Sequence, residues 1–235
     1  MESFVVFDIE TTGISPTNHR ITEIGAIKVV NNQVVEEFNQ LINPEVVIPN
    51  NIVALTGITD KLVKNEPMIE DVLPEFIDFC RDFVIMGHNI AFDFSFIKAN
   101  ALRHKLVFEK HAIDTLTIAR KVLCELPSRK LSSLCKHYAI DYLNGHRAYN
   151  DAYCTYELFN RLKQDYYEKH PELFVAKPIH WKPAKTSAIT SKQKAFLAAL
   201  VKRHQVILDK QIDELTKSEA SQAIDRIIHL YGKAR

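Results

Sequence analysis

Two carboxylates lie at the end of an apolar run close to the start of the chain. Residues 4–7 (FVVF) have the pattern of a buried strand, and Asp8 and Glu10 follow it. Side chains two residues apart in an extended chain leave the same face, so these carboxylates would lie side by side and repel each other. A divalent cation between them would remove the repulsion. The alternative, which a lone Asp-x-Glu favours, is a strand that ends in a solvated acidic turn.

Three further groups that could do chemistry also lie at the ends of predicted elements. Asp93 follows a predicted strand at 82–87, and Asp151 lies early in a helix predicted from about 147 to 167. His146 lies in the turn before that helix, and an imidazole can accept a proton from water near neutral pH. Hard oxygen ligands suit Mg²⁺ or Mn²⁺ better than zinc. The alternatives are a helix N-cap for Asp93 and a satisfied turn residue for His146.

Three short blocks in a fixed order carry a resemblance to a known family. They are residues 7–13 (FDIETTG), 87–93 (GHNIAFD) and 146–152 (HRAYNDA), and residues 48–59 add a softer match. With them, the chain resembles the DEDDh-type 3′–5′ exonucleases, the family of the proofreading epsilon subunit of bacterial DNA polymerase III. The likeness spans residues 4 to about 165.

The resemblance implies a ribonuclease H-like fold and hydrolysis with two divalent cations, Mg²⁺ or Mn²⁺. It implies that Asp8, Glu10 and Asp151 hold the cation that carries the attacking water. Asp8 would also bridge to the second cation, and Asp93 would act largely through bound water. His146 would be the general base.

The resemblance also implies contacts with the terminal nucleotide. The candidate substrate-binding residues are Thr11, Thr12, Gly13, Ile52, Leu55, His88, Asn89 and Arg147. Thr11 and the adjacent backbone would meet the 3′-hydroxyl, and His88 and Asn89 would lie near the scissile bond. Ile52 and Leu55 would wedge against the terminal base, with core packing as the alternative. Arg147 is interpreted as a phosphate contact or a solvated arginine.

The remaining patterns predict an α/β fold with a mixed five-stranded sheet flanked by helices. After the first strand, β-rich runs at 21–30 and 34–42 predict a meander, and two more strands are predicted at 82–87 and 112–115. Helical spacing predicts helices at 60–64, 70–81, from the second block to about 104, and near 115–124, 129–138 and 147–167.

The charge distribution divides the chain. Residues 171–235 hold 12 Lys and Arg against 6 Asp and Glu, whereas residues 1–170 hold 18 against 23. We therefore expect a catalytic domain at 1–170, a proline-containing linker or wrapping segment at 171–188 and a small basic helical module at 189–235. Two capping-box patterns, Thr190 with Gln193 and Thr216 with Glu219, predict helices at about 191–204 and 218–231.

Composition narrows the class of protein. No apolar run reaches 18 residues, so we expect no membrane partner, and a strand at the N-terminus leaves no room for a signal peptide. Four scattered cysteines without a Cys-x-x-Cys pair indicate free thiols and a cytoplasmic protein.

We expect an exonuclease that acts at nucleic-acid 3′ ends, on single-stranded DNA first, with RNA substrates as the alternative. A polymerase or replication partner would be consistent with the resemblance. The rival interpretation is a non-catalytic module that binds nucleic acid or a partner. His146 argues against it, because such a module needs no general base.

Overall fold

The computed structural model describes residues 3–142, 145–183, 187–208 and 210–232. They form two compact units, Met1–Trp181 and Lys182–Arg235. Each unit has hydrophobic clusters of its own.

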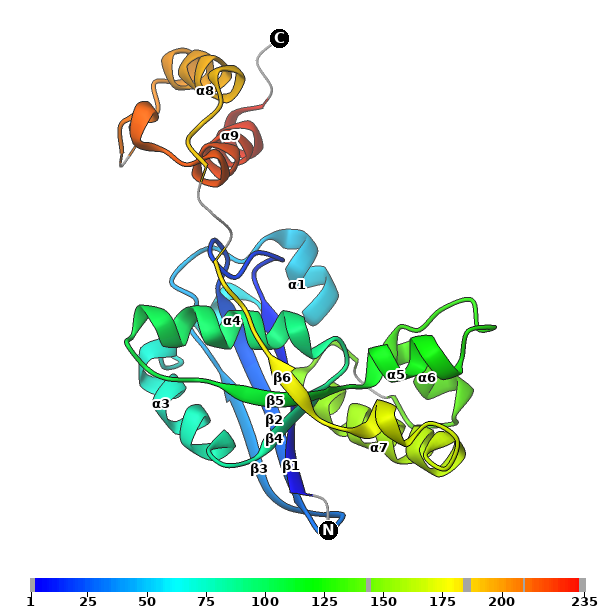
Figure 1. The fold of residues 1–235 in the computed structure, drawn as a ribbon. Helices are drawn as coiled ribbons and strands as arrows, with labels where there is room; N and C mark the ends of the chain where they lie inside the picture. Colours follow the sequence, from blue (N-terminus) through cyan, green and yellow to red (C-terminus); the bar gives the residue numbers. More distant parts are fainter. Residues whose placement is uncertain (1–2, 143–144, 184–186, 209, 233–235) are drawn as a thin grey trace. The chain divides into compact units, whose positions relative to one another are not determined.

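The first unit is built on a mixed, six-stranded sheet (Figure 1). Its strands are β1 (Ser3–Thr11), β2 (Ile21–Val30), β3 (Gln33–Leu41), β4 (Val84–Gly87), β5 (Lys110–Asp114) and β6 (Lys177–Ile179). They lie in the order β3-β2-β1-β4-β5-β6. The first three form the antiparallel meander that the sequence predicts, while β4 and β5 continue the sheet parallel to β1.

Helices cover both faces of this sheet. They are α1 (Asn50–Thr56), α2 (Asp60–Val63), α3 (Ile69–Cys80), α4 (Ile90–Arg103), α5 (Thr115–Val122), α6 (Leu131–His137) and α7 (Ala148–Tyr166). Helices α3 and α4 share one hydrophobic cluster with the sheet, and α5, α6 and α7 share another (Figure 1). None of the helices in the described residues is both long and apolar enough to cross a membrane.

The side chains of the central strand β1 alternate between the two hydrophobic clusters. Val5, Phe7 and Ile9 are buried on the side of α3 and α4. Phe4 and Val6 are buried on the side of α5, α6 and α7. Each such side chain contributes about 1.5–3 kcal/mol by leaving water, so β1 is fixed rigidly on both faces. The residues that follow inherit the same alternation.

The sequence predicts five strands, and the structure has a sixth. Strand β6 is three residues long and pairs antiparallel with β5, with Pro178 opposite His111. A proline is tolerated there because β6 is an edge strand, whose outer side needs no ladder hydrogen bond. A three-residue strand containing proline gives no alternation that a sequence pattern could detect.

The predicted linker or wrapping segment at 171–188 packs against the first unit in its first half. Residues Pro171–Phe174 form a 3₁₀ turn, and Phe174 is buried with its ring centroid 5.8 Å from that of Phe159 in α7. Together with β6 this segment belongs to the first unit, which ends at Trp181. Of the predicted linker, residues 184–186 lie outside the described residues.

The second unit is a small helical hairpin. Helices α8 (Ser191–His204) and α9 (Lys217–Tyr231) enclose a core of Leu197, Leu200, Leu215, Ala220 and Ile227. Both predicted capping boxes are confirmed, since each threonine accepts the backbone N–H three residues on and the Gln or Glu side chain accepts the threonine's own N–H. Residues 209 and 233–235 of the predicted module lie outside the described residues.

The burial of Phe174 leads to a stability prediction. We expect Phe174→Ala to lower the free energy of unfolding of the first unit by about 3 kcal/mol, because it opens a cavity in the cluster under α7. The adjacent Val175 is 60% exposed and provides the matched control, Val175→Ala, which should change it by less than about 0.5 kcal/mol. Urea unfolding followed by the fluorescence of Trp181 measures both. Equal midpoints for the two variants would restore the linker interpretation.

Candidate active site

Strand β1 carries Asp8 and Glu10 past the end of its neighbour β4. The two carboxylates continue the face of Phe4 and Val6, against which α7 packs. The registered pairs between β1 and β4 end at Val6 with Met86. Beyond that point the backbone of β1 has no strand on this side, and side chains from other elements can approach it.

Asp93 occupies the gap that β4 leaves. It lies in the first turn of α4, is buried, and its Oδ1 accepts the backbone N–H of Ile9 at 3.0 Å. The N-cap of α4 is Asn89, so the alternative of Asp93 as the N-cap is not what the structure shows. A carboxylate from α4 is thereby fixed on the residue that separates Asp8 from Glu10.

Helix α7 brings the other two predicted groups to the same place. One ligand atom each from Glu10, His146 and Asp151 lie within 4.8 Å of one another. His146 is exposed and its backbone is left-handed, with φ of 64°. That conformation costs a non-glycine residue about 1–2 kcal/mol and turns the chain sharply into α7.

Asp151 has one oxygen bonded and one free. Tyr142 Oη donates to its Oδ2 at 3.2 Å. Its Oδ1 is buried, and no hydrogen-bond partner for it exists among the described residues. A buried carboxylate oxygen without a partner costs free energy, so this atom can act as an acceptor for a ligand or a cation.

The carboxylates strongly affect one another. Burial, and then the charges of Asp93, Asp151 and Glu10, raises the pKa of Asp8 well above its ordinary value. Burial followed by the charges of Asp151 and Glu23 raises the pKa of Glu10 to about 8. Burial is also the largest cause that raises the pKa of Asp93, to about 8, and that of Asp151. All four therefore lie within reach of each other's fields.

This donor set fits divalent cations. Four carboxylates gather at one end of the sheet, and the buried Oδ1 of Asp151, which has no hydrogen-bond partner among the described residues, could serve as a ligand atom. Oxygen-rich sites of this kind suit hard cations, and positive charge is what lowers the mutual repulsion. The structure brings all five predicted groups, Asp8, Glu10, Asp93, His146 and Asp151, to this site.

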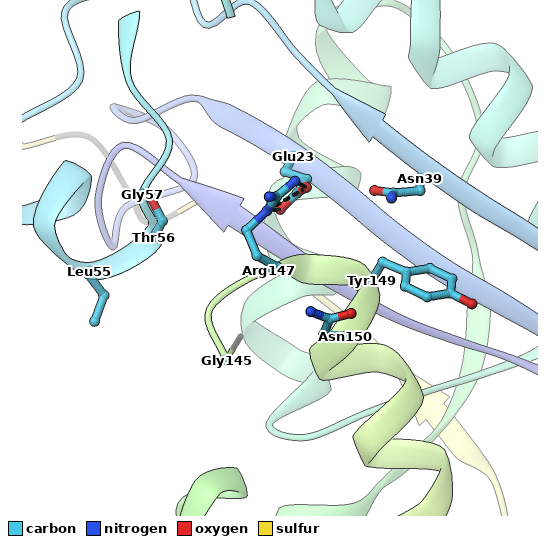
Figure 2. Close-up of a pocket in the computed structure, with 9 residues that line it drawn as sticks. All are labelled: Glu23, Asn39, Leu55, Thr56, Gly57, Gly145, Arg147, Tyr149 and Asn150. Carbon is cyan, nitrogen blue, oxygen red and sulfur yellow. Dashed lines mark hydrogen bonds and ion pairs between the residues drawn. The ribbon is translucent and has the colours of Figure 1, made fainter. Parts of the chain in front are cut away.

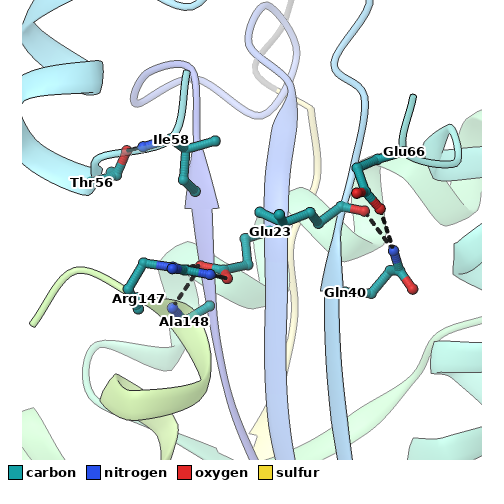
Figure 3. Close-up of polar contacts among 8 residues, drawn as sticks. Glu23, Gln40, Thr56, Ile58, Glu66, Arg147 and Ala148 are labelled. Atoms are coloured by element: carbon teal, nitrogen blue, oxygen red, sulfur yellow. Dashed lines mark hydrogen bonds and ion pairs between the residues drawn. The ribbon is translucent and has the colours of Figure 1, made fainter. Parts of the chain in front are cut away.

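An ion pair between the buried Glu23 and the half-exposed Arg147 fixes the start of α7 on β2 (Figure 3). Glu23 accepts hydrogen bonds from Arg147 Nη2 at 2.6 Å and Nε at 3.1 Å, and from the backbone N–H of Ala148 at 3.0 Å. Two residues on, a Cβ at Gly25 would lie 2.0 Å from the backbone N of Tyr149, so only glycine lets the helix approach this closely. We call Glu23, Gly25 and Arg147 the α7 seat.

The α7 seat changes the interpretation of Arg147. The sequence allows a phosphate contact or a solvated arginine, whereas the structure pairs its guanidinium bidentately with Glu23. Charge-assisted bidentate pairs of this kind are strong and geometrically specific. We therefore assign Arg147 to holding α7, with His146 immediately before it.

The side chains of Thr11 and Thr12, two of the predicted substrate contacts, form hydrogen bonds within the turn that follows β1. Thr11 Oγ1 donates to the carbonyl of Gly13 at 2.7 Å, and Thr12 Oγ1 accepts the backbone N–H of Arg20 at 3.0 Å. Both threonines are buried. Their side chains shape the turn after β1, and their contact with a 3′-hydroxyl stays a prediction.

The two apolar residues of α1 have different environments. Ile52 packs against Ile48, Ile58 and Val63, as the core alternative predicts. Leu55 is 51% exposed and lines both cavities at the site. An exposed leucine beside the acidic cluster is free to stack on a base, so Leu55 remains the candidate wedge.

His88 and Asn89 also have different environments: the ring of His88 is hydrogen-bonded within the fold, whereas Asn89 is exposed. The Nε2 of His88 donates to the carbonyl of Arg129 at 2.8 Å, and its Nδ1 lies 2.9 Å from Thr115 Oγ1. Burial lowers the pKa of His88 and favours the neutral ring. Asn89 is exposed, with a left-handed backbone, and donates its N–H to Asp114. His88 thus ties the segment before α6 to the site.

Two cavities flank the cluster. One of about 440 Å³ lies over the α7 seat and is lined by Glu23, Arg147, Thr56 and Tyr149 among others (Figure 2). The other, about 740 Å³, is lined by His146, Asp151, Tyr142 and His88 together with basic side chains. Leu55 borders both. The acidic cluster opens into the second of these cavities, which Asp151 and His146 line.

Sequence reasoning missed Glu23, Gly25 and Tyr142. A signal existed for the first two, because a charged residue and a glycine interrupt the apolar run of β2. A carboxylate in a buried strand needs a partner, and a glycine there marks a close backbone approach. No pattern identifies Tyr142, which precedes the third block in an irregular segment.

A sequence model of the exonuclease family, of the RNase T type, matches residues 5–159. The chain belongs to this exonuclease family. The predicted resemblance to an exonuclease family is thereby confirmed.

Several curated relatives of this chain are much longer DNA polymerases. The chain is 43% identical over 159 residues to the PolC-type DNA polymerase III of Caldanaerobacter subterraneus, covering 68% of this chain and 11% of the relative. It is 39% identical over 160 residues to the same polymerase of Thermotoga maritima, covering 68% and 12%. The chain thus spans about a tenth of the length of these relatives.

Solved structures share the fold. The nuclease domain of 3′hExo, a DEDDh family member bound to rAMP, aligns with a TM-score of 0.63 and 18% identity over 76% of this chain and 98% of that one. Exonuclease X in complex with 5′ overhanging duplex DNA aligns with a TM-score of 0.56 and 24% identity over 69% and 92%. The predicted ribonuclease H-like fold is confirmed.

The raised pKa values predict how stability depends on pH without metal. The folded protein binds protons more tightly than the unfolded chain between pH 4.5, the ordinary value for Glu10, and about 8. Stability from this site is therefore full at low pH and is lost as the pH rises through 8, by up to about 1.4 kcal/mol per pH unit for one group. Melting temperatures in EDTA from pH 5 to 8 measure this loss.

Glu10→Gln supplies the comparison for that series. Its melting temperature should fall less between pH 5 and 8 than that of the wild type, and Mn²⁺ should raise the wild type most at pH 8. A wild-type melting temperature that falls no more than that of Glu10→Gln between pH 5 and 8 would contradict the clustering.

The α7 seat gives a second stability prediction. Arg147→Met leaves the buried Glu23 unpaired and should cost about 2–3 kcal/mol, at the low end for such pairs because the Arg147 side chain is 40% exposed. Adding Glu23→Gln should recover part of the loss by removing the buried charge. Urea unfolding measures both, with Arg161→Met on the exposed face of α7 as the control. An Arg147→Met midpoint equal to that of the control would show that the pair does not hold α7.

Proposed function

We propose that this chain removes nucleoside 5′-monophosphates from the 3′ ends of nucleic acid, with single-stranded DNA as the preferred substrate. The observation that supports it best is the approach of His146 to Glu10 and Asp151 within 4.8 Å. A binding-only module needs acceptors for a metal or a strand end, but it has no use for an exposed imidazole beside them.

In this proposal Asp8, Glu10, Asp93 and Asp151 hold two divalent cations, Mg²⁺ or Mn²⁺. When bound, such cations supply a nucleophile at neutral pH and stabilise charge on the attacking and leaving oxygens. The free Oδ1 of Asp151 is the acceptor that supports this assignment. His146 accepts the proton of the attacking water, and its exposed position lets that proton pass to solvent.

The preference for DNA draws on the relatives. The PolC-type relatives are DNA polymerases by name, and a zinc-bound exonuclease I of E. coli was solved as a single-stranded DNA complex with a TM-score of 0.63 and 22% identity, over 74% of this chain and 42% of that one. The RNA alternative is favoured by the rAMP bound to 3′hExo. We also propose a polymerase or replication partner, supported by the similarity to a segment of those polymerases.

A side-by-side digestion tests the function. With Mn²⁺ or Mg²⁺ we expect 5′-labelled single-stranded DNA to shorten one nucleotide at a time from its 3′ end, faster than duplex DNA, mismatched duplex DNA or short RNA. Asp8→Ala should abolish cleavage without loss of folding, since it removes a charge that Glu10 repels. His146→Ala should lower kcat by roughly 10²–10⁴.

Asp71→Ala, an exposed carboxylate on α3, is the control and should cleave like the wild type. Full-length substrate with every metal, on DNA and RNA alike, would favour the binding module. Faster digestion of RNA would transfer the assignment to an exoribonuclease of the same chemistry.

A further inference from the structure

The larger cavity continues away from the carboxylates along a basic wall. Its lining passes from Asp151 and His146 to Arg120 on α5, and to Arg129 and Lys130 just before α6. Among these lining residues Asp151 is the one acidic side chain. The first 170 residues carry more acidic than basic groups, so three cations on one side of one cavity are a local reversal of charge. We call Arg120, Arg129 and Lys130 the basic wall.

Two of these cations have no counter-ion among the described residues. Arg120 and Lys130 are exposed, and neither forms an ion pair with any residue that the structure describes. Some basic side chains elsewhere, such as Lys28 on Glu36, do have carboxylate partners. Unpaired cations that line a cavity raise the local concentration of anions within it.

The third cation is anchored to the site. Arg129 Nε donates to the carbonyl of Leu123 at 3.1 Å and its Nη2 donates to that of Cys124, which holds the turn between α5 and α6. The carbonyl of Arg129 itself accepts the Nε2 proton of His88, which follows β4 in the block that leads to Asp93. Arg129 is therefore held by hydrogen bonds to the block that leads to Asp93.

We propose that the basic wall binds the backbone phosphates of the strand upstream of its 3′-terminal nucleotide. This inference rests on the proposed function, because the terminal phosphodiester must lie at the carboxylates. The carboxylates need the scissile phosphate to be delivered against their own negative charge, and cations beside them offset that repulsion. A backbone-binding wall of this kind is indifferent to base sequence.

Binding is measured first, independently of cleavage. The affinity of a fluorescent single-stranded hexanucleotide is followed by anisotropy in EDTA, from about 50 to 200 mM salt. We expect Arg120→Gln/Lys130→Gln to weaken binding about 5- to 20-fold at low salt. The slope of log affinity against log salt should become shallower by about 1.4, because each phosphate that the variant no longer neutralises accounts for about 0.7.

The matched control is Lys121→Gln/Lys136→Gln. These lysines are exposed on α5 and α6, next to the basic wall, but do not line the cavity. The control removes the same amount of charge from the same part of the molecule and should bind like the wild type. Equal binding and equal salt slopes in the two double variants would overturn the proposal.

A chromogenic nucleoside 5′-(p-nitrophenyl) phosphate separates this inference from the proposed function. The compound has a phosphodiester but no upstream strand, so the Arg120→Gln/Lys130→Gln variant should hydrolyse it with wild-type kcat and KM. With the hexanucleotide, KM should rise while kcat is retained. Equal loss on both substrates would show that these residues act at the reacting phosphate and not upstream. Wild-type inertness toward both substrates would overturn the proposed function, while the anisotropy result would still decide the basic wall.

Discussion

Repulsion among buried carboxylates is the constraint on which the rest of this structure depends. Asp8, Glu10, Asp93 and Asp151 come from three separate elements, and burial together with their mutual charge raises the pKa of each. A flexible scaffold would relax by letting the groups move apart into water. The site can exist only because the elements that carry them are held by other interactions that are stronger than this repulsion.

Those interactions are ordinary packing and two polar connections. Strand β1 is buried on both faces, so its direction at Asp8 is set before any charge is considered. Asp93 is held by the N–H that β4 leaves open on Ile9, and α7 is held by Glu23 with Gly25 beneath it. The buried Glu23 is unfavourable alone, and Arg147 with a helix N–H makes it tolerable. The buried charge of Glu23 thus positions α7, and with it the buried carboxylate of Asp151.

The sequence predicts the ends of elements better than the interactions between them. The carboxylates at 8, 10, 93 and 151 could be found because each follows an apolar run or opens a helix, and the meander and capped helices follow from periodicity. Strand β6 could not, because Lys177–Ile179 is too short and contains a proline. The pairing of Arg147 with Glu23 crosses 124 residues, and no local pattern encodes a partner at that distance. Leu55 and Ile52 look alike in sequence and differ only in what surrounds them.

The hydrogen bond from His88 to Arg129 uses a main-chain carbonyl as its acceptor. A backbone carbonyl is present whatever amino acid occupies the position, so the anchor does not constrain the side chain there. Arg129 also holds the turn through its side chain, so it is Lys130, exposed beside this anchor, that is free to change without displacing the segment. The charge beside the carboxylates is thus set by single exposed side chains, whereas the position of the segment is set in part by the backbone.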